Sequence, residues 1–186
     1  MATGTGGSGR QAGSSFKTFT LVAAIEQGID PNTMIDASAT AKLPGWEVAN
    51  INHTNYGTKS ISDAFAVSSN TAFARLILSI GPDKVVDVAK RMGITSPLTA
   101  TGSLTLGSES VTPLEMANAY ATIANGGTHY DPECVERIVD RNGSIVVDNS
   151  APKGTRAISA EVAHAATEVM KGVITKGTGQ AAALSN

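Results

Sequence analysis

The sequence predicts a mainly helical fold with one β-hairpin, on three observations. Apolar residues recur at helical spacing in six stretches, and most of these stretches begin at a capping residue or end at glycine. One Asn-Gly pair, Asn142-Gly143, lies between two short β-like runs and predicts a single hairpin. The chain has 186 residues, of which 41% are apolar, which suits one domain or a large piece of one.

The first 59 residues contain one clear element. Residues 1–12 are predicted to be a flexible lead, because glycines give the backbone too much freedom to order cheaply. Apolar residues from Phe16 to Ile29 follow the spacing of a well-buried helix that ends at Gly28. Residues 30–59 are rich in proline, glycine and asparagine, so an irregular segment is expected there, anchored by Trp46.

Side-chain caps mark the later helices. Ser60 can cap a helix that runs to about Val67, and Asp63 favours the positive end of its dipole. Thr112-Pro113-Leu114-Glu115 combines a cap, a proline at the first helical position and a capping-box glutamate. Residues 94–111, rich in Ser, Thr and Gly, are predicted to form a loop. The remaining helices are expected over 71–80, 82–92, 112–125 and about 159–175.

The hairpin is predicted within residues 131–150. Residues 134–140 and 144–148 are β-like, and Arg141-Asn142-Gly143 lies between them. Asn-Gly favours the tight turn because both residues tolerate positive φ.

Composition excludes several classes of function. The formal net charge is −2, so no basic field is present to bind nucleic acid, and aromatic residues are only 4%. Cys134 is the only cysteine and the three histidines show no ligand spacing, so neither a metal nor another cofactor is expected. No apolar run reaches the length of a transmembrane helix, and no targeting segment is visible.

A serine and a lysine stand three residues apart at the start of the first helix. Ser14 and Lys17 therefore face the same way, and a lysine amine with a lowered pKa can activate a serine hydroxyl. The alternative is a capping serine beside an exposed lysine. Ser150 and Lys153 repeat the spacing, so spacing alone favours that alternative.

Two further motifs carry possible chemistry. Ser68-Ser69-Asn70 lies between two predicted helices, where Ser68 could relay a proton and Asn70 could hold a substrate amide. The alternative is a cap at a helix junction. Lys176-Gly177-Thr178-Gly179 follows a helix and is interpreted as a helix end and loop, outside any site.

Together, these segments resemble the penicillin-binding protein family, and most closely the transpeptidase domain of its bifunctional, two-domain members. The similarity extends from about Arg10 to Asn186, with four blocks in the family's order. The blocks are Gly9 to Thr20 with the active serine, Ser60 to Thr71 with the second motif, Leu106 to Gly127, and Val169 to Ala182.

The resemblance implies a mixed α/β fold of the serine β-lactamase and transpeptidase type. It implies that Ser14 is the acylated nucleophile, Lys17 its base, Ser68 a proton relay and Asn70 a clamp for the substrate amide. The backbone N–H of Ser14 would form half of the oxyanion hole. The implied activity is D,D-transpeptidation of peptidoglycan stem peptides, with acylation by β-lactams. The implied parent is a membrane-anchored protein on the outer face of a bacterial membrane, with a glycosyltransferase domain.

The sequence departs from the family in two ways. Ala12 and Thr18 stand where proline is common in the family. Family members also have a strand pair before the serine segment and a Lys-Thr-Gly strand after the last block. Residues 13–186 are therefore expected to be a partial domain that lacks most of the central sheet. In that case Phe16, Phe19 and Val22 would form an open apolar surface, and the chain alone would be inactive and poorly soluble.

Two other functions remain open. The first keeps the fold but replaces the acceptor amine with water, as in a D,D-carboxypeptidase or a serine β-lactamase. Ser69 argues mildly against the common β-lactamase, whose second motif is Ser-Asp-Asn. The second is a non-catalytic piece that recognises β-lactams or is purely structural.

Overall fold

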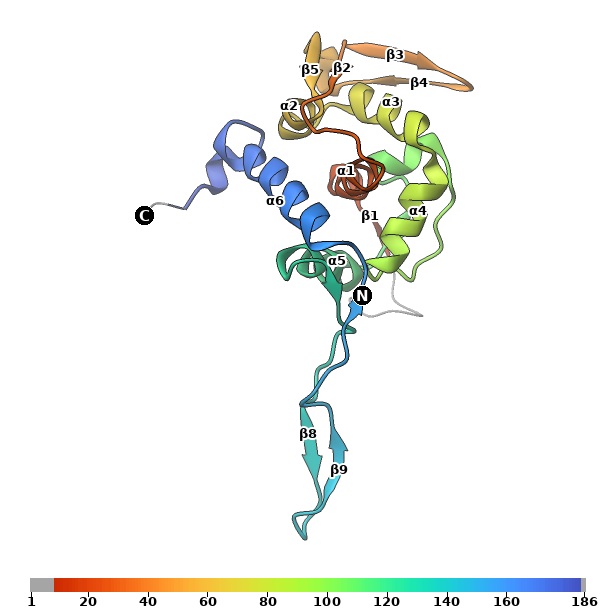
Figure 1. Cartoon of the computed structure of the whole chain (residues 1–186). Helices are drawn as coiled ribbons and strands as arrows, with labels where there is room; N and C mark the ends of the chain where they lie inside the picture. Colours follow the sequence, from red (N-terminus) through yellow and green to blue (C-terminus); the bar gives the residue numbers. More distant parts are fainter. Residues whose placement is uncertain (1–8, 185–186) are drawn as a thin grey trace.

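The computed structural model describes residues 9–184 and centres on one buried helix (Figure 1). Helix α1 (Lys17–Glu26) continues directly from a 3-10 turn, η1 (Gly13–Phe16). Around α1 lie α3 (Asn70–Ile80), α4 (Pro82–Arg91) and α6 (Ala160–Thr175), each in contact with it. The chain thus places its most completely buried long helix among amphipathic ones.

The expectation of an open apolar face on the first helix is wrong. Phe16, Phe19 and Val22 are all completely buried, and the Phe16 and Phe19 rings lie 4.6 Å apart at a tilt. The surrounding helices cover the face that was assigned to a missing sheet. Burial of each such side chain contributes about 1.5–3 kcal/mol to stability. The apolar face that was expected to make the chain poorly soluble is therefore covered.

Local capping signals correctly predict the helix starts. Ser60 Oγ accepts a hydrogen bond from the backbone N–H of Asp63 at 3.0 Å and caps α2 (Ile61–Ala66). Thr112 and Glu115 form the predicted capping box of α5 (Pro113–Ala124). The first helix ends at Glu26, slightly before the predicted Gly28. The additional short 3-10 turns are η2 (Ile51–His53), η3 (Gly102–Leu106) and η4 (Gln180–Ala182).

The irregular segment predicted for residues 30–59 is wrong in part, because four short strands lie there. β3 (Thr40–Leu43) and β4 (Trp46–Ala49) form a second hairpin, and β2 (Met34–Asp36) pairs with β5 (Thr58–Ser60). Gly45 has a φ of +80° in the hairpin turn, a conformation that favours glycine. These strands are short and half-exposed, so no long alternation of apolar and polar residues marks them.

Two more antiparallel ladders pair remote segments. β1 (Arg10–Gln11) pairs with β6 (Ser110–Val111), and β7 (Thr128–His129) pairs with β10 (Thr155–Arg156). Residues 1–8 of the predicted flexible lead lie outside the described residues, whereas Arg10 and Gln11, which were assigned to that lead, form the paired strand β1. Every ladder between residues 9 and 184 has two strands.

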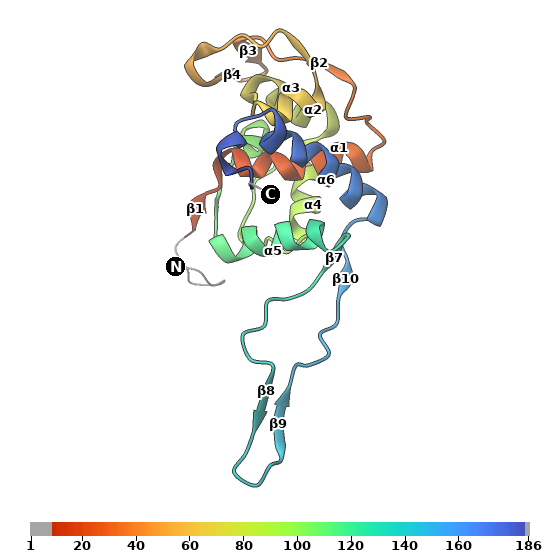
Figure 2. The same ribbon diagram turned by 90° about the vertical axis from the view of Figure 1, so that its left-hand side faces the viewer.

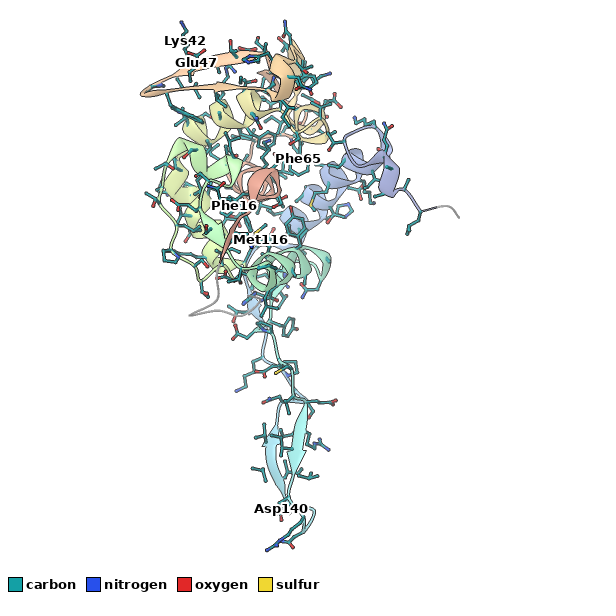
Figure 3. The ribbon with its side chains drawn as sticks, turned by 180° about the vertical axis from the view of Figure 1, so that it is seen from behind. Phe16, Lys42, Glu47, Phe65, Met116 and Asp140 are labelled. Atoms are coloured by element: carbon teal, nitrogen blue, oxygen red, sulfur yellow. The ribbon has the colours of Figure 1, made fainter. Side chains whose placement is uncertain are left out.

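The predicted hairpin of residues 131–150 projects from the helical body (Figures 1 and 2). It consists of β8 (Arg137–Val139) and β9 (Ile145–Asp148), and Gly143 takes a φ of +83° in the turn. Phe16 and Phe65 point into the body, whereas Asp140 lies at the exposed hairpin tip (Figure 3). Across residues 9–184, no helix is both long enough and apolar enough to cross a membrane.

Candidate active site

The site begins at the turn that leads into α1. Ser14 lies in η1 and Lys17 is the first residue of α1, so both side chains project from the same face. Lys17 Nζ donates to Ser14 Oγ at 3.0 Å. Gly107 packs directly on Gly13 with a φ of +69°, and a Cβ there would overlap the Gly13 backbone. Close packing of the Gly107 and Gly13 backbones thus holds the serine turn in place.

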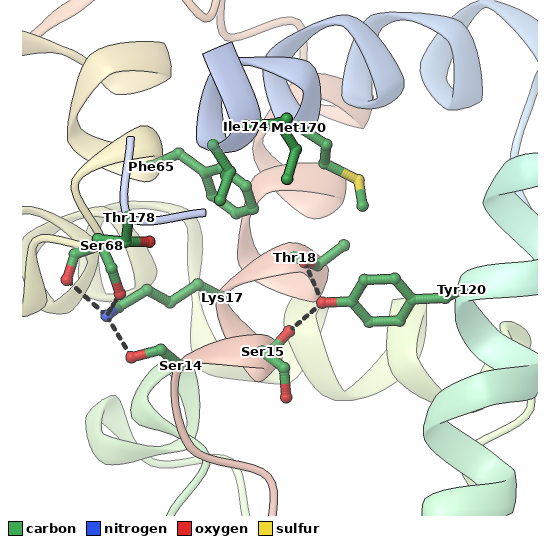
Figure 4. A pocket seen from close by; sticks show the side chains of 11 residues that line it. Ser14, Ser15, Lys17, Thr18, Phe65, Ser68, Tyr120, Met170, Ile174 and Thr178 are labelled. Carbon is green, nitrogen blue, oxygen red and sulfur yellow. Dashed lines mark hydrogen bonds between the residues drawn. The ribbon is translucent and has the colours of Figure 1, made fainter. Parts of the chain in front are cut away.

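The second side of the site is the junction between α2 and α3. Lys17 Nζ donates to Ser68 Oγ at 3.0 Å, to the Ser68 carbonyl oxygen at 2.9 Å and to Asn70 Oδ1 at 2.8 Å. The structure therefore brings all four predicted residues, Ser14, Lys17, Ser68 and Asn70, around one nitrogen atom. Figure 4 shows Ser14 and Ser68 converging on the Lys17 amine.

Lys17 is buried without a charged partner among its hydrogen bonds. Only 1% of the surface of Lys17 is exposed, and the four oxygen atoms that accept hydrogen bonds from its amine are all uncharged. Burial penalises the ammonium form and lowers the pKa of Lys17 from 10.5 to about 8. A lysine amine with that pKa is partly neutral near pH 7, and the neutral amine can accept a proton.

The Asn70 side chain is fixed at both ends. Its Oδ1 accepts from Lys17, and its Nδ2 donates to the Ala49 carbonyl oxygen at the end of β4, at 3.0 Å. The amide keeps a second N–H and a second oxygen lone pair for another partner. The site can therefore offer a substrate amide one oriented donor or acceptor here.

A cavity of about 390 Å³ opens beside these polar groups (Figure 4). Ser14, Lys17 and Ser68 line its polar end. The rest of the wall is mainly apolar and comes from α2, α5 and α6. Its large apolar residues are Phe65, Tyr120, Met170, Val173 and Ile174.

Two residues at the cavity were missed in the sequence. The Tyr120 hydroxyl donates to the Ser15 carbonyl oxygen at 2.9 Å and shares a 2.8 Å hydrogen bond with Thr18 Oγ1, so α5 is tied to the serine turn. Burial raises the pKa of Tyr120, although the Thr18 hydrogen bond opposes the shift. Thr178 also lines the cavity, and its backbone N–H donates to the Ala66 carbonyl oxygen at 3.0 Å. The expectation that the whole Lys176–Gly179 stretch lies outside the site is therefore wrong for this residue. No spacing pattern marks Tyr120, and Thr178 stands in a stretch predicted to form a helix end and loop.

Lys176 and the Ser150–Lys153 pair lie outside the cavity wall. Lys176 is the C-cap of α6 and forms a surface ion pair with Asp63, as the helix-end interpretation predicts. Ser150 and Lys153 are exposed near the base of the projecting hairpin, where Ser150 Oγ bonds Asp148. Over residues 9–184, no three histidine, cysteine, aspartate or glutamate side chains gather as a metal-binding group.

Comparison with known sequences identifies relatives across most of the chain. Residues 5–186 match the penicillin binding protein transpeptidase domain family. Penicillin-binding protein 1A of Mycobacterium tuberculosis is 34% identical over 163 residues, which cover 79% of this chain and 20% of the relative. Penicillin-binding protein 1A of Rickettsia typhi is 34% identical over 179 residues, with 92% and 23% coverage.

Solved structures share the architecture. The PonA1 protein of M. tuberculosis, in complex with penicillin V, superposes with a TM-score of 0.82 at 33% identity, covering 89% of this chain and 48% of that one. The D,D-transpeptidase domain of a peptidoglycan glycosyltransferase from Eggerthella lenta gives 0.84 at 27% identity, with 97% and 52% coverage. These likenesses confirm the predicted transpeptidase-like fold.

The chain spans about a fifth of the length of these curated relatives. The match nevertheless extends through both sides of the Lys17 site, from the serine turn to the α2–α3 junction, and continues to the end of the sequence. The chain belongs to the penicillin-binding protein transpeptidase domain family.

Proposed function

We propose that this chain carries the acylation centre of a peptidoglycan D,D-transpeptidase. The observation that carries the proposal is the buried Lys17 amine, which lies 3.0 Å from both the Ser14 and the Ser68 hydroxyl oxygens. The relative PonA1, crystallised with penicillin V, supports the same chemistry because a β-lactam is an acylating agent for such a serine.

Acylation proceeds by general base catalysis. Neutral Lys17 takes the proton of Ser14 Oγ while that oxygen attacks the carbonyl carbon of the D-alanyl-D-alanine bond. The backbone N–H of Ser14, at the start of the helical segment where N–H groups lack intrahelical acceptors, donates to the oxyanion. The lysine proton passes through the Ser68 hydroxyl to the departing amine. The C–N bond breaks, D-alanine leaves, and an ester on Ser14 remains.

The second half-reaction transfers the acyl group to an amine of another stem peptide. The acceptor nitrogen attacks the ester carbonyl, its proton passes to the Ser68–Lys17 pair, and the Ser14 oxygen leaves and recovers a proton. Asn70 holds the backbone amide of the donor peptide through its free amide positions. A β-lactam follows only the first half, because its opened ring stays attached to the acyl group.

The parent is proposed to act on the outer face of a bacterial membrane. Relatives called penicillin-binding protein 1A, and a structural relative whose name includes a peptidoglycan glycosyltransferase, support a bifunctional, membrane-anchored parent. The partners proposed for this chain are therefore peptidoglycan stem peptides and β-lactams.

A fluorescent penicillin tests the proposal in the protein that carries this chain. Ser14→Ala is expected to abolish the covalent band on a denaturing gel, because it removes the attacking oxygen. Ser15→Ala is the matched control, since Ser15 Oγ only donates to the Ala12 carbonyl oxygen at 2.7 Å. Equal labelling of Ser14→Ala and the unaltered protein would contradict the assignment.

The lifetime of the label distinguishes the related activities. A band that persists for hours supports a transpeptidase, whereas rapid loss supports a carboxypeptidase or β-lactamase, in which water attacks the ester. No carboxylate lies among the described residues that line the cavity, so a carboxylate is not the base that activates water there. The absence of any label would support a non-catalytic piece.

A further inference from the structure

A buried asparagine lies directly behind the second motif. Asn50 follows β4, is 3% exposed and contacts two fully buried side chains, Ser69 and Thr71. A buried amide is costly unless its hydrogen-bonding groups are satisfied. Among the described residues, no buried side-chain polar atom lacks a partner, and Asn50 uses both ends of its amide.

The nitrogen end of Asn50 ties down the loop around the β3–β4 hairpin. Nδ2 donates to the carbonyl oxygens of Ala37 at 3.1 Å, Ser38 at 3.1 Å and Thr54 at 3.0 Å. The backbone N–H of Asn50 also donates to the Ala39 carbonyl oxygen at 2.9 Å. Asn50 is therefore anchored to both chain segments that flank the hairpin.

The oxygen end of Asn50 reaches the α2–α3 junction. Oδ1 accepts from Ser69 Oγ at 3.0 Å and from the backbone N–H of Thr71 at 3.2 Å. Ser69 and Thr71 lie on either side of Asn70 in the sequence, and Ser69 directly follows Ser68. One oxygen atom thus holds the Ser69 side chain and the Thr71 backbone, on either side of Asn70.

The junction needs such support because its backbone is strained. Ser68 has a φ of +56°, a left-handed conformation that non-glycine residues adopt only when their surroundings hold them. Its hydroxyl must still lie 3.0 Å from Lys17 Nζ. Ser69 adds to the support, since its Oγ caps α3 by accepting from the Ala72 N–H at 3.3 Å.

We propose that Asn50 is a positioning residue for acyl transfer, which acts through Ser69 and Thr71 to hold Ser68 and Asn70 against Lys17. The inference rests on the proposed function. Asn50 is not among the residues that line the cavity beside Ser14. Loss of its amide frees the strained turn to relax, which moves the Ser68 hydroxyl out of line with the amine. A misplacement of about 1 Å typically costs about 100-fold in rate.

Acylation kinetics of Asn50→Ala in the protein that carries this chain test the inference. Labelling rates over a range of fluorescent penicillin concentrations separate the acylation rate constant from the prior binding constant. We expect the rate constant to fall about 10- to 100-fold, while the binding constant changes by less than about threefold. Glu115→Gln is the matched control. Glu115 is also a buried hydrogen-bonding hub, but its partners are Thr95, Ser96 and Thr112, away from Lys17.

A second comparison separates positioning from a general loss of structure. In a Ser68→Ala background, Asn50→Ala should slow acylation less than in the unaltered protein, because one of the two groups that it positions, the Ser68 hydroxyl, is already gone. An undiminished effect would overturn the inference. If Asn50→Ala does not fold, Ser69→Ala removes the hydroxyl that donates to Oδ1 at 3.0 Å, and so breaks the contact from the other side. That variant must also acylate slowly, and a normal rate overturns the inference.

Failure of the inference and failure of the proposed function give different results. Normal labelling of the unaltered protein with an unchanged rate constant in Asn50→Ala removes the positioning role and leaves the acyl-serine proposal intact. Absence of Ser14-dependent labelling in the unaltered protein overturns the proposed function itself, and the positioning role falls with it.

Discussion

The rate of Ser14 acylation should follow the ionisation of Lys17. Only the neutral amine can take the serine proton, and burial lowers the pKa of Lys17 to about 8. For that pKa, the neutral fraction is about 1% at pH 6 and about 50% at pH 8. The acylation rate is therefore expected to rise about 50-fold between pH 6 and pH 8, and then about twofold more before it levels off.

The pH profile distinguishes this site from an ordinary lysine. An exposed amine with the usual pKa of 10.5 would give a rate that still rises about tenfold per pH unit between pH 8 and pH 10. The measurement is the second-order rate constant of labelling by a fluorescent penicillin at constant ionic strength. Circular dichroism at each pH shows that the fold is unchanged, and reactions without protein correct for alkaline hydrolysis of the drug.

Two results would refute the reasoning. A rate that is constant from pH 6 to pH 9 would show that no base with a pKa near 8 limits acylation. A rate that keeps rising tenfold per unit above pH 9 would show that burial does not lower its pKa. Lys17→Met serves as the control, because methionine keeps the length and helix propensity but cannot take a proton. It should show little acylation and no such pH dependence.

Two further predictions concern residues outside the cavity wall. Lys176→Ala should change the acylation rate by less than about twofold, because Lys176 pairs with Asp63 at the surface. A fall in the acylation rate as large as that of Lys17→Met would contradict this prediction. Glu115→Gln should lower the free energy of unfolding at pH 7 by about 3 kcal/mol in urea denaturation. Burial alone would raise the pKa of Glu115, but hydrogen bonds from Thr112, Thr95 and Ser96 outweigh it and lower the pKa to about 2. The pKa of Glu115 in the folded state thus lies below the unfolded value of 4.5, so this stabilisation is present above pH 4.5 and lost as the pH falls towards 2. If Glu115→Gln lost as much stability in acid as the unaltered protein does, this explanation would be wrong.

Helices with local signals could be predicted from the sequence. The Ser60 cap and the Thr112–Glu115 capping box each need only residues within one helical turn, so their geometry follows from the sequence. The strands between residues 30 and 59 could not be predicted in the same way. The β2–β5 ladder joins segments remote in sequence, and its register depends on contacts with the folded helices.

The site residues also differ in whether local spacing or the packing of remote segments brings them together. Ser14 and Lys17 share a helix face, so their proximity follows from spacing alone. Their approach to Ser68 and Asn70 depends on how α1 packs against the α2–α3 junction, and only the family resemblance indicated it. Asn50 was missed because it lies in a segment predicted to be irregular. The inactivity expected of the chain alone stays a prediction.

Mass spectrometry of the penicillin adduct tests the central claim most directly. Trypsin cuts after Arg10 and Lys17, so the peptide Gln11–Lys17 carries both Ser14 and Ser15. After labelling and digestion, that peptide should gain the mass of the opened penicillin, and fragmentation should assign the added mass to Ser14. An adduct on Ser15, or on any peptide that lacks both serines, would contradict the account.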